Sequence, residues 1–339
     1  MIRKTAMQSC NLHQLPAPPP DRSGWPWNVE TVPWPQEMPD GRPWPKISII
    51  TPSYNQGRYI EETIRSVLLQ GYPNLEFFII DGGSNDETVE IIRKYEPWLA
   101  GWVSEKDKGQ SDAINKGFAR CSGEVFNWLC SDDVLAEGAL QTVASVFTKK
   151  PATDVVAGAC YFQFDDEPEQ SSVRQVEWRG WELTPFVGAI YQPSCFFRMS
   201  LIARSALVRT DLHYCMDREL WTYLCSRQAK WEWSEQSLSV FRFTGENKSV
   251  VGRQQIINEL EIIYRSYVKE KVPLPWLLRK CWLPLVVMNM GHSSAAVRFF
   301  SLGASRAITM FLLAIYPPFR VKALQSELYH FGRYSLGGN

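Results

Sequence analysis

The feature that most constrains the fold of this chain is a regular alternation of short apolar runs and helix-like patterns that begins at Lys46. The run ISII at 47–50 and the run LEFFII at 75–80 are each long enough for one buried strand. Between them, segment 60–69 places apolar residues at helical spacing, namely Ile60, Ile64, Val67 and Leu68. A strand, a helix and a second strand in this order predict a unit with two parallel strands.

The alternation continues beyond the second run. Ser84 and Glu87 form an S-x-x-E capping box, which predicts that a helix opens there. Further elements are expected as a helix within 115–120, a strand at 125–129, a helix at 138–147 and a strand at 155–162. The pattern predicts an α/β fold with a mostly parallel, Rossmann-like sheet flanked by helices and a ligand site at the carboxyl ends of the strands.

The segment before this alternation, residues 1–45, is rich in proline and tryptophan. Proline fixes φ and removes a backbone donor, so the segment is expected to be neither a regular helix nor a central strand. A disordered linker is one interpretation. Four tryptophans are costly to leave in water, however, so an extended arm laid over the domain is the other, and the sequence does not choose between them.

The chain becomes strongly apolar and basic between Pro273 and Pro318. Its apolar runs fall short of the roughly 18 to 20 uninterrupted residues that a membrane-spanning helix needs, and Arg279, Arg298 and Arg306 interrupt the region. A buried helical hairpin and helices that lie on a membrane surface are both consistent with this pattern. The chain thus divides into an arm at 1–45, a domain at 46–250 and a helical region at 251–339, a candidate for membrane association.

Charge and cysteine content exclude several classes of protein. The 36 basic and 36 acidic residues balance, which argues against binding nucleic acid along the whole chain. The eight cysteines are widely spaced, with no zinc-like cluster, and are expected to be reduced thiols in a cytosolic protein. The first twenty residues lack the apolar core of a secretory signal, so export is not expected.

Acidic residues follow several of the predicted elements. Asp81 ends the run at 75–80, the pair Asp132 and Asp133 follows the strand at 125–129, and Asp217 lies in YCMDRELW. A single aspartate is also a common turn or N-cap residue. Two adjacent carboxylates are more informative, because their repulsion must be relieved, and Mg²⁺ and Mn²⁺ bind one or two carboxylates together with substrate phosphates.

Three dense segments resemble the nucleotide-sugar-binding half of a family 2 glycosyltransferase with the GT-A fold. They are KISIITPSYNQGRYIEETIRSVLLQGYPNLEFFIIDGGSNDET, SEKDKGQSDAINKGFA and VFNWLCSDDVLAEGAL, within about residues 46–140. The likeness continues more thinly through QPSCFFRMSL, MDRELWTYL and VFRFTGENKS. It implies a divalent cation, Mn²⁺ or Mg²⁺, and a nucleoside diphosphate sugar as donor, with a UDP-sugar favoured.

The resemblance also implies roles for individual residues. Around the nucleotide base and ribose it places Thr51, Pro52, Tyr54 and Asp81. The G-x-S-x-A-x-N pattern that borders the ribose and diphosphate is matched by Gly109, Ser111, Ala113 and Asn115, although glycine and serine also suit a helix entry. A pyrimidine edge offers an N–H donor, which gives an acceptor such as Asp81 a direct use.

The metal and diphosphate positions depart in part from the family pattern. Where the family has D-x-D-D, this chain has Cys130, Ser131, Asp132 and Asp133, so one carboxylate is replaced by a thiol. The resemblance implies Asp132 and Asp133 as metal ligands. Thr244 stands where a histidine is common, while Arg242 and Lys248 supply charge for the diphosphate.

Asp217 matches the family's general base, which would accept a proton from the acceptor hydroxyl while that oxygen displaces the diphosphate with inversion. A helix N-cap is the competing interpretation of this residue. The acceptor class expected from the resemblance is a saccharide or a lipid-linked saccharide in bacterial surface polysaccharide biosynthesis, with the protein cytoplasmic or peripheral on the inner face of the membrane.

Three other classes of protein can be compared with the same sequence motifs. A sugar nucleotidyltransferase needs a glycine-rich phosphate loop after the first strand, and TPSYNQG holds a single glycine. A dinucleotide oxidoreductase needs G-x-G-x-x-G, which neither TPSYNQGRY nor DGGSND provides. A non-catalytic module that binds nucleotide sugars stays open, supported by Cys130 and Thr244.

Overall fold

The computed structural model describes residues 10–164, 167–173, 190–244, 247, 253–268, 274–291, 294–316, 321–322 and 325. The chain divides into two compact units. The first comprises 1–177, 190–216 and 228–247, and the second comprises 178–189, 217–227 and 248–339.

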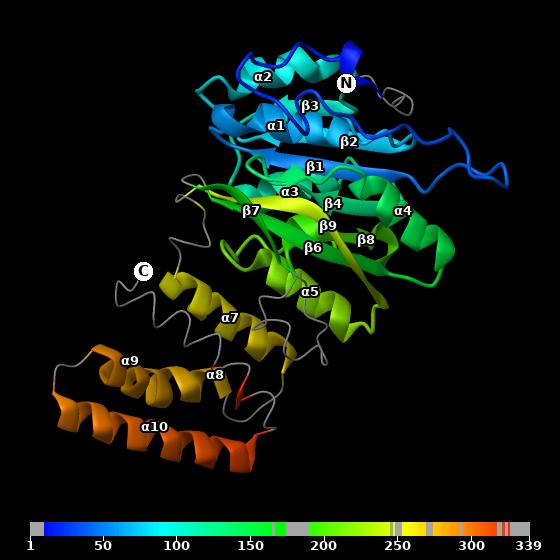
Figure 1. The fold of residues 1–339 in the computed structure, drawn as a ribbon. Coiled ribbons are helices and arrows are strands. Elements are labelled where there is room, and N and C mark those ends of the chain that lie inside the picture. The colour runs from blue at the N-terminus through cyan, green and yellow to red at the C-terminus, as the bar shows by residue number, and fades with distance from the viewer. Residues whose placement is uncertain are drawn as a thin grey trace. The chain divides into compact units, whose positions relative to one another are not determined.

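The first unit is built on one mixed sheet, whose first half consists of four parallel strands (Figure 1). These strands are β1 (Ile47–Ser53), β2 (Leu75–Asp81), β3 (Gly101–Ser104) and β4 (Val125–Trp128). They are ordered β3-β2-β1-β4, and all three pairings are parallel. The strands predicted at 47–50, 75–80 and 125–129 are therefore confirmed.

The second half of the sheet continues as β8-β6-β9-β5, with β7 paired to β6. Its strands are β5 (Val134–Leu135), β6 (Val155–Phe164), β7 (Glu167–Val173), β8 (Cys195–Arg198) and β9 (Trp231–Phe243). Strand β8 is antiparallel to both β4 and β6, whereas β6 and β9 are parallel. The predicted α/β sheet is confirmed, and the antiparallel pairings all lie beyond β4.

Four helices flank the strands of this sheet. They are α1 (Gly57–Leu68), α2 (Thr88–Tyr95), α3 (Gln110–Phe118) and α4 (Ala139–Lys149). The order β1-β2-β3 runs outward and the return to β4 crosses back over β1, so right-handed connections put α1 and α2 on one face and α3 on the other. Gly117 of α3 packs so closely on Ile50 that an added Cβ would lie 2.6 Å from the Ile50 side chain.

The described residues also include short 3₁₀ turns, at Leu12–Gln14, Glu96–Trp98, Gln192–Ser194 and Met199–Leu201.

The predicted capping box at Ser84 is wrong, because the hydroxyl of Ser84 donates to the Asp81 carboxylate instead. Helix α2 begins at Thr88, and no side-chain hydrogen bond comes from its N-cap residue, Glu87. Asp86 takes the capping position in space, since it accepts hydrogen bonds from the backbone N–H of Thr88 (3.1 Å) and of Gly57 (2.9 Å). The Ser84 hydroxyl therefore binds the carboxylate of Asp81 at the end of β2 and does not cap α2.

Residues 10–45 form an extended arm over the first unit, which decides between the two interpretations of this segment in favour of the arm (Figure 1). The indole N–H of Trp25 donates to the carbonyl of Leu135 at 2.7 Å. The buried guanidinium of Arg65 donates to three arm carbonyls, at 2.7 to 3.1 Å, from Pro16, Pro26 and Trp27. Trp27 is itself buried.

The second unit is helical in its described part. Its elements are α5 (Met216–Ser226, whose first residue belongs to the first unit), α7 (Arg253–Tyr267), α8 (Leu274–Leu277), a π-helical turn (Leu278–Trp282), α9 (Leu283–Gly291) and α10 (Ala295–Ile315). Helices α9 and α10 lie side by side (Figure 1). By length and composition, α10 alone among the described helices is long and apolar enough to cross a membrane.

All eight cysteines lie in described residues, and no disulfide joins any two of them.

Candidate active site

The carboxyl end of β1 contains polar groups that the fold leaves unsatisfied. Thr51 and Ser53 are buried, and neither hydroxyl has a hydrogen-bond partner within the described residues. Pro52 between them is also buried, whereas the predicted ligand residue Tyr54 is 61% exposed. Because a buried hydroxyl without a partner costs about 1 to 3 kcal/mol, such groups at a strand end are available to a ligand or to bound water.

The loops after β1 and β2 are joined to each other directly beyond these hydroxyls. Asn55 has a positive φ of 52°, an uncommon conformation for a residue other than glycine. Its backbone N–H donates to Ser84 at 2.7 Å, and its side-chain oxygen accepts from the backbone N–H of Asn85 at 3.0 Å. A strained residue held by two contacts of this kind is typical of a binding loop.

Asp81 lies buried at the end of β2, and its carboxylate is occupied by the protein itself. It accepts from the backbone N–H groups of Gly83 (3.1 Å) and Ser84 (2.9 Å) and from the hydroxyl of Ser104 (2.6 Å). The residue therefore shapes the β2–α2 loop and ties it to β3. A contact with the nucleotide base stays a prediction.

The G-x-S-x-A-x-N segment opens α3, and its polar side chains hold a neighbouring loop. Ser111 donates to the carbonyl of Leu212 at 3.2 Å. The side chain of Asn115 donates to the carbonyl of Val208 (2.9 Å) and accepts from its N–H (3.0 Å). These contacts support the loop at 208–212, and the predicted contact of Ser111 with the ribose or diphosphate is not tested by them.

Cys130, Asp132 and Asp133 gather just after β4. One ligand atom from each lies within 4.8 Å of the others. The Asp132 carboxylate accepts from the Asn247 side chain at 3.2 Å, and Asp133 accepts from the backbone N–H of Arg242, also at 3.2 Å. The three residues are therefore arranged as a small donor set of two carboxylates and one thiol.

Desolvation makes this donor set costly to ionise. Burial raises the pKa of Asp132 above its usual range, although the charge of Arg242 opposes this. Burial and the neighbouring charge of Asp132 raise the pKa of Asp133 well above its usual range. A divalent cation would remove both penalties, so the donors present fit Mg²⁺ or Mn²⁺.

Arg242 joins this group from the end of β9 and is itself buried. One guanidinium nitrogen donates to Glu62 at 2.9 Å, and the guanidinium carbon lies 5.0 Å from the centre of the Tyr59 ring. The other terminal nitrogen, Nη1, is buried and has no hydrogen-bond partner within the described residues. A buried cationic donor of this kind fits the predicted contact with a diphosphate.

Several residues of the site were not singled out from the sequence. Asn247 contacts Asp132 and also donates to the carbonyl of Arg242 at 2.9 Å, and its side-chain oxygen accepts from the N–H of Thr244 at 2.6 Å. Gln110 donates to the Cys130 sulfur at 3.2 Å. Asn247 lies in the RFTGENKS segment, whose resemblance to the family could have identified it as a site residue. No local sequence pattern indicates a role for Gln110. Lys248 lies outside the described residues.

Asp217, the predicted general base, belongs to the second unit, in the first turn of α5. Its carboxylate accepts from the backbone N–H of the next residue, Arg218, at 2.7 Å. An N-cap side chain accepts from the N–H two or three residues ahead, so this contact does not make Asp217 an N-cap. Burial raises its pKa; the charge of Arg218 opposes that rise and the charge of Glu259 adds to it. A raised pKa suits a proton acceptor that must later release its proton.

Comparison with known proteins adds sequence relatives to this geometry. Residues 48–210 match the model of the family Glycosyl transferase family 2. An uncharacterized glycosyltransferase of Rickettsia prowazekii is 32% identical over 127 residues, which are 38% of this chain and 39% of that protein. One from Mycobacterium tuberculosis is 36% identical over 114 residues, which are 33% of this chain and 44% of that protein. The chain thus spans well under two thirds of these curated relatives.

Solved structures resemble the fold at low sequence identity. The Staphylococcus structure described as S. aureus TarS 1-349 matches with a TM-score of 0.52 and 15% identity, over 86% of this chain and 92% of that one. The mannosyltransferase PcManGT of Pyrobaculum calidifontis, solved with GDP-Man and Mn²⁺, matches with a TM-score of 0.56 and 18% identity, over 91% and 89%. Residues 48–210, just under half of the chain, thus form a segment of glycosyl transferase family 2, and the fold is GT-A-like.

Proposed function

We propose that this protein is an inverting glycosyltransferase that moves a sugar from a nucleoside diphosphate sugar to a hydroxyl group of its acceptor. The observation that carries the proposal is a group of buried or desolvated polar side chains at the carboxyl ends of β1 and β4 and at the end of β9. Thr51, Ser53, the Asp132–Asp133 pair and Nη1 of Arg242 offer hydroxyls, carboxylates and a cationic donor, which suit a nucleoside diphosphate with its metal.

A uridine diphosphate sugar is the favoured donor. One structure of S. aureus TarS 1-349, with a TM-score of 0.52, holds UDP-GlcNAc, and PcManGT holds GDP-Man, so neighbours of this fold accept either base. We propose that Thr51, Pro52, Tyr54 and Asp81 surround the base and ribose, with Ser111 beside the ribose and diphosphate. Arg242, together with Lys248, would face the diphosphate.

Asp132 and Asp133 are the residues that would hold a divalent cation, with the Cys130 sulfur close by. Bound there, Mn²⁺ or Mg²⁺ supplies positive charge that stabilises the departing diphosphate. Arg242 adds fixed positive charge from the protein and is held in place by Glu62. Because the guanidinium is preorganised and desolvated, it stabilises charge that develops on the phosphate oxygens without reorganisation.

Asp217 is proposed as the general base. Its carboxylate accepts the proton of the acceptor hydroxyl while that oxygen forms a bond to C1 of the sugar. The bond from C1 to the diphosphate oxygen breaks, its electron pair leaves with the diphosphate, and the configuration at C1 inverts. A raised pKa makes Asp217 a stronger base than an exposed aspartate.

The proposed acceptor is a saccharide or a lipid-linked saccharide of a bacterial surface polysaccharide. The proposed compartment is the cytoplasm, at the inner face of the membrane, where reduced thiols persist. The absence of disulfides among the eight cysteines supports this compartment.

The shift in melting temperature with nucleotides tests the proposal. UDP, GDP, dTDP and CDP are each added with Mn²⁺ and with a chelator. At a hundred times Kd a ligand stabilises the folded state by about 2.7 kcal/mol, so one nucleotide is expected to raise the melting temperature by several degrees, and the chelator is expected to reduce that shift. No shift with any nucleotide would contradict the proposal.

A non-catalytic nucleotide-sugar-binding module is the second candidate, favoured only by Cys130 in place of an expected carboxylate and by Thr244 in place of a common histidine. Incubating the protein with UDP-sugars and Mn²⁺ and measuring released UDP distinguishes the two. Slow hydrolysis of one donor without acceptor supports an enzyme. Tight binding of every donor with no UDP released, even with acceptor extracts, supports the module.

A further inference from the structure

The surface of α10 is inverted relative to a helix of a water-soluble domain. Its buried residues are two serines and one leucine, namely Ser301 (3% exposed), Ser305 (6%) and Leu312 (1%). The largest apolar side chains lie outward and are 56 to 80% exposed, namely Phe299, Phe300, Met310, Phe311 and Ile315. In a soluble domain the large apolar residues would face the neighbouring helix, so this arrangement needs an apolar environment outside the protein.

The packing between α9 and α10 is consistent with that reading. Both buried serines return their hydroxyls to their own helix, Ser301 to the carbonyl of Arg298 (3.0 Å) and Ser305 to that of Leu302 (2.9 Å). Their polar groups are thus satisfied within α10, and their small size lets another helix approach closely. Small residues at the helix contact and large ones outside are the distribution found for helices packed in lipid.

The charge of residues 271–326 indicates which kind of apolar environment matches the exposed face of α10. Between residues 271 and 326 the sequence contains no aspartate or glutamate, although the whole chain is balanced. The same stretch contains seven basic residues, Lys271, Arg279, Lys280, Arg298, Arg306, Arg320 and Lys322. A region with apolar residues and positive charge only is complementary to a bilayer surface that carries anionic headgroups.

The position of the arginines distinguishes a helix on the membrane from one across it. Arg306 lies in the middle of α10, seven residues after Phe299 and therefore nearly in line with it along the helix. Arg298 lies further round the same side, and both arginines are exposed. In a spanning helix Arg306 would be near the bilayer centre, where an arginine is strongly disfavoured, whereas at the edge of an in-plane apolar face it reaches the headgroups.

We infer that α10 is a membrane-docking surface that binds an anionic bilayer in the plane of the membrane, with Phe299, Phe300, Met310, Phe311 and Ile315 in the acyl region and Arg298 and Arg306 at the phosphate groups. This surface is independent of nucleotide binding and does not rest on the proposed reaction. Its occupant is lipid rather than a second copy of the chain, because a second copy would bring the same positive charge against this one.

Flotation with vesicles tests the inference on the full chain. Vesicles of phosphatidylcholine alone are compared with vesicles that also contain phosphatidylglycerol. We expect the protein to float with the anionic vesicles at low salt and to dissociate in part at high salt. The double variant Phe300→Glu/Phe311→Glu should lower the partition coefficient onto anionic vesicles at least tenfold, and Arg298→Gln/Arg306→Gln should lower it about fivefold for each arginine removed.

Val32→Glu is the matched control for the phenylalanine variants, because Val32 is 79% exposed and lies in the arm of the first unit. It introduces a glutamate on an exposed apolar position and is expected to float like the wild type. Circular dichroism and melting temperature check that each variant is folded. If the phenylalanine variant fails to fold, the arginine variant and the salt dependence still decide, because each predicts weaker binding to anionic vesicles only.

Three outcomes would overturn the inference. The wild-type chain could stay with the unbound protein at every lipid composition. It could instead be a dimer by light scattering that Phe300→Glu/Phe311→Glu dissociates, with no change in flotation. Finally, it could be extractable only by detergent and resist alkaline washing, which would show that the helix crosses the bilayer.

Discussion

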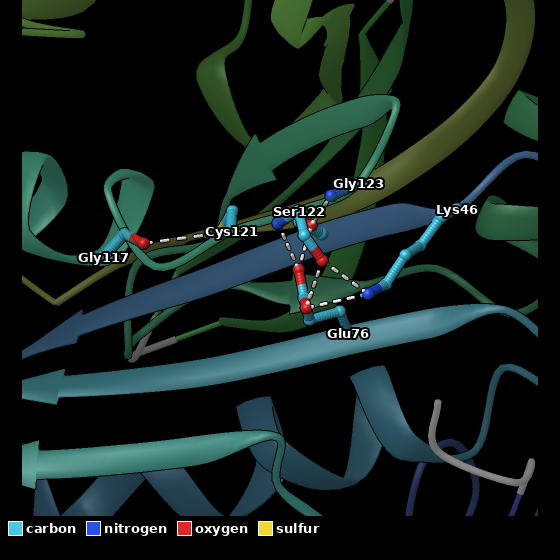
Figure 2. Close-up of polar contacts among 7 residues, drawn as sticks. Lys46, Glu76, Gly117, Cys121, Ser122 and Gly123 are labelled. Atoms are coloured by element: carbon cyan, nitrogen blue, oxygen red, sulfur yellow. Dashed lines mark hydrogen bonds and ion pairs between the residues drawn. The ribbon is translucent and has the colours of Figure 1, made fainter. Parts of the chain in front are cut away.

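The two ends of the same parallel strands treat their polar groups in opposite ways. At the amino ends of β1 and β2, polar contacts join Lys46, Ser48, Glu76 and Ser122. Figure 2 shows Lys46, Glu76 and Ser122 of this set. The Glu76 carboxylate accepts from Lys46 (2.9 Å), Ser48 (2.6 Å) and the backbone N–H of Ser122 (2.7 Å). At the carboxyl ends, the hydroxyls of Thr51 and Ser53 have no partner within the described residues.

The pKa values of the carboxylates at the two ends also shift in opposite directions. Burial alone would raise the pKa of Glu76, but hydrogen bonds from Ser48, Lys46 and Ser122 outweigh it and lower the pKa. Burial raises the pKa of Asp132 and of Asp133, and the charge of Arg242 does not compensate for it. The amino ends therefore satisfy their charge internally, whereas at the carboxyl ends Asp81 is satisfied by the protein and the desolvated Asp132 and Asp133 are available to a ligand.

The largest predicted effect separates binding from chemistry. Asp217→Asn should lower kcat by about 10² to 10⁴-fold, because the amide cannot accept the hydroxyl proton. The dissociation constant for UDP with Mn²⁺ should stay within about twofold, since no role in holding the nucleotide is proposed for Asp217. Steady-state kinetics and calorimetric titration measure the two quantities.

Its control is Asp211→Asn, at an exposed position where the carboxylate pairs with Arg209. This variant should keep nearly all activity. Loss of activity in both variants to the same degree would mean that Asp217 acts only through stability.

The next largest predicted effect is a loss of UDP affinity caused by a substitution at the carboxyl end of β4. Asp132→Asn should weaken UDP binding in the presence of Mn²⁺ about ten- to hundredfold, which corresponds to one lost charged contact of 1.5 to 3 kcal/mol. Without ligand the variant should be at least as stable as the wild type, since a desolvated charge beside Asp133 is gone. Calorimetry and urea unfolding check the two parts, and unchanged UDP affinity would remove Asp132 from the site.

Glu76→Gln breaks the amino-end cluster instead. The variant should lose about 1.5 to 3 kcal/mol of unfolding free energy, because charge-assisted hydrogen bonds are weakened and Lys46 loses its partner. UDP binding should not change. Urea unfolding monitored by tryptophan fluorescence measures the difference.

The pH dependence of that difference follows from the sign of the shift. The pKa of Glu76 is lower in the folded state, so its contribution is complete above the unfolded-state pKa and disappears as the pH falls through the folded-state pKa. Wild type and Glu76→Gln should therefore converge in stability in acid. A difference that grows toward low pH would contradict this assignment.

The smallest effect compares two positions on one strand. Ser48→Ala should destabilise the protein by about 1 to 2 kcal/mol, because it leaves Glu76 and the N–H of Gly123 short of a partner. Thr51→Val removes a hydroxyl that has no partner and should be neutral or stabilising without ligand. Equal losses from both substitutions would mean that the Thr51 hydroxyl is satisfied.

The sequence predicted the parts of the fold that local pattern determines. Strands β1, β2 and β4 are rich in apolar residues, and the segments between them carry helical periodicity, so the alternation of strands and helices and the parallel direction followed from the local pattern. Strand β3 was not predicted, because a four-residue strand depends on its neighbour β2 for its pairing.

The site was predictable where residues are adjacent and unpredictable where they are distant. The Asp132–Asp133 pair is visible in the sequence, whereas the contact of Arg242 with Glu62 joins residues 180 positions apart. The predicted capping box is wrong for a related reason. The sequence pattern does not show that the Ser84 hydroxyl donates to Asp81 at the end of β2. Local rules describe each residue's options, and tertiary contacts decide among them.

Hydrogen exchange of the wild-type protein, with and without UDP and Mn²⁺, tests the contrast between the two ends most directly. We predict slower exchange in the loops at the carboxyl ends, 54–57, 82–87 and 130–133. Exchange in the loops at the amino ends, 72–74 and 119–124, should not change, because those groups are already satisfied. Protection confined to the amino ends, or spread equally over both, would contradict the assignment of the nucleotide site.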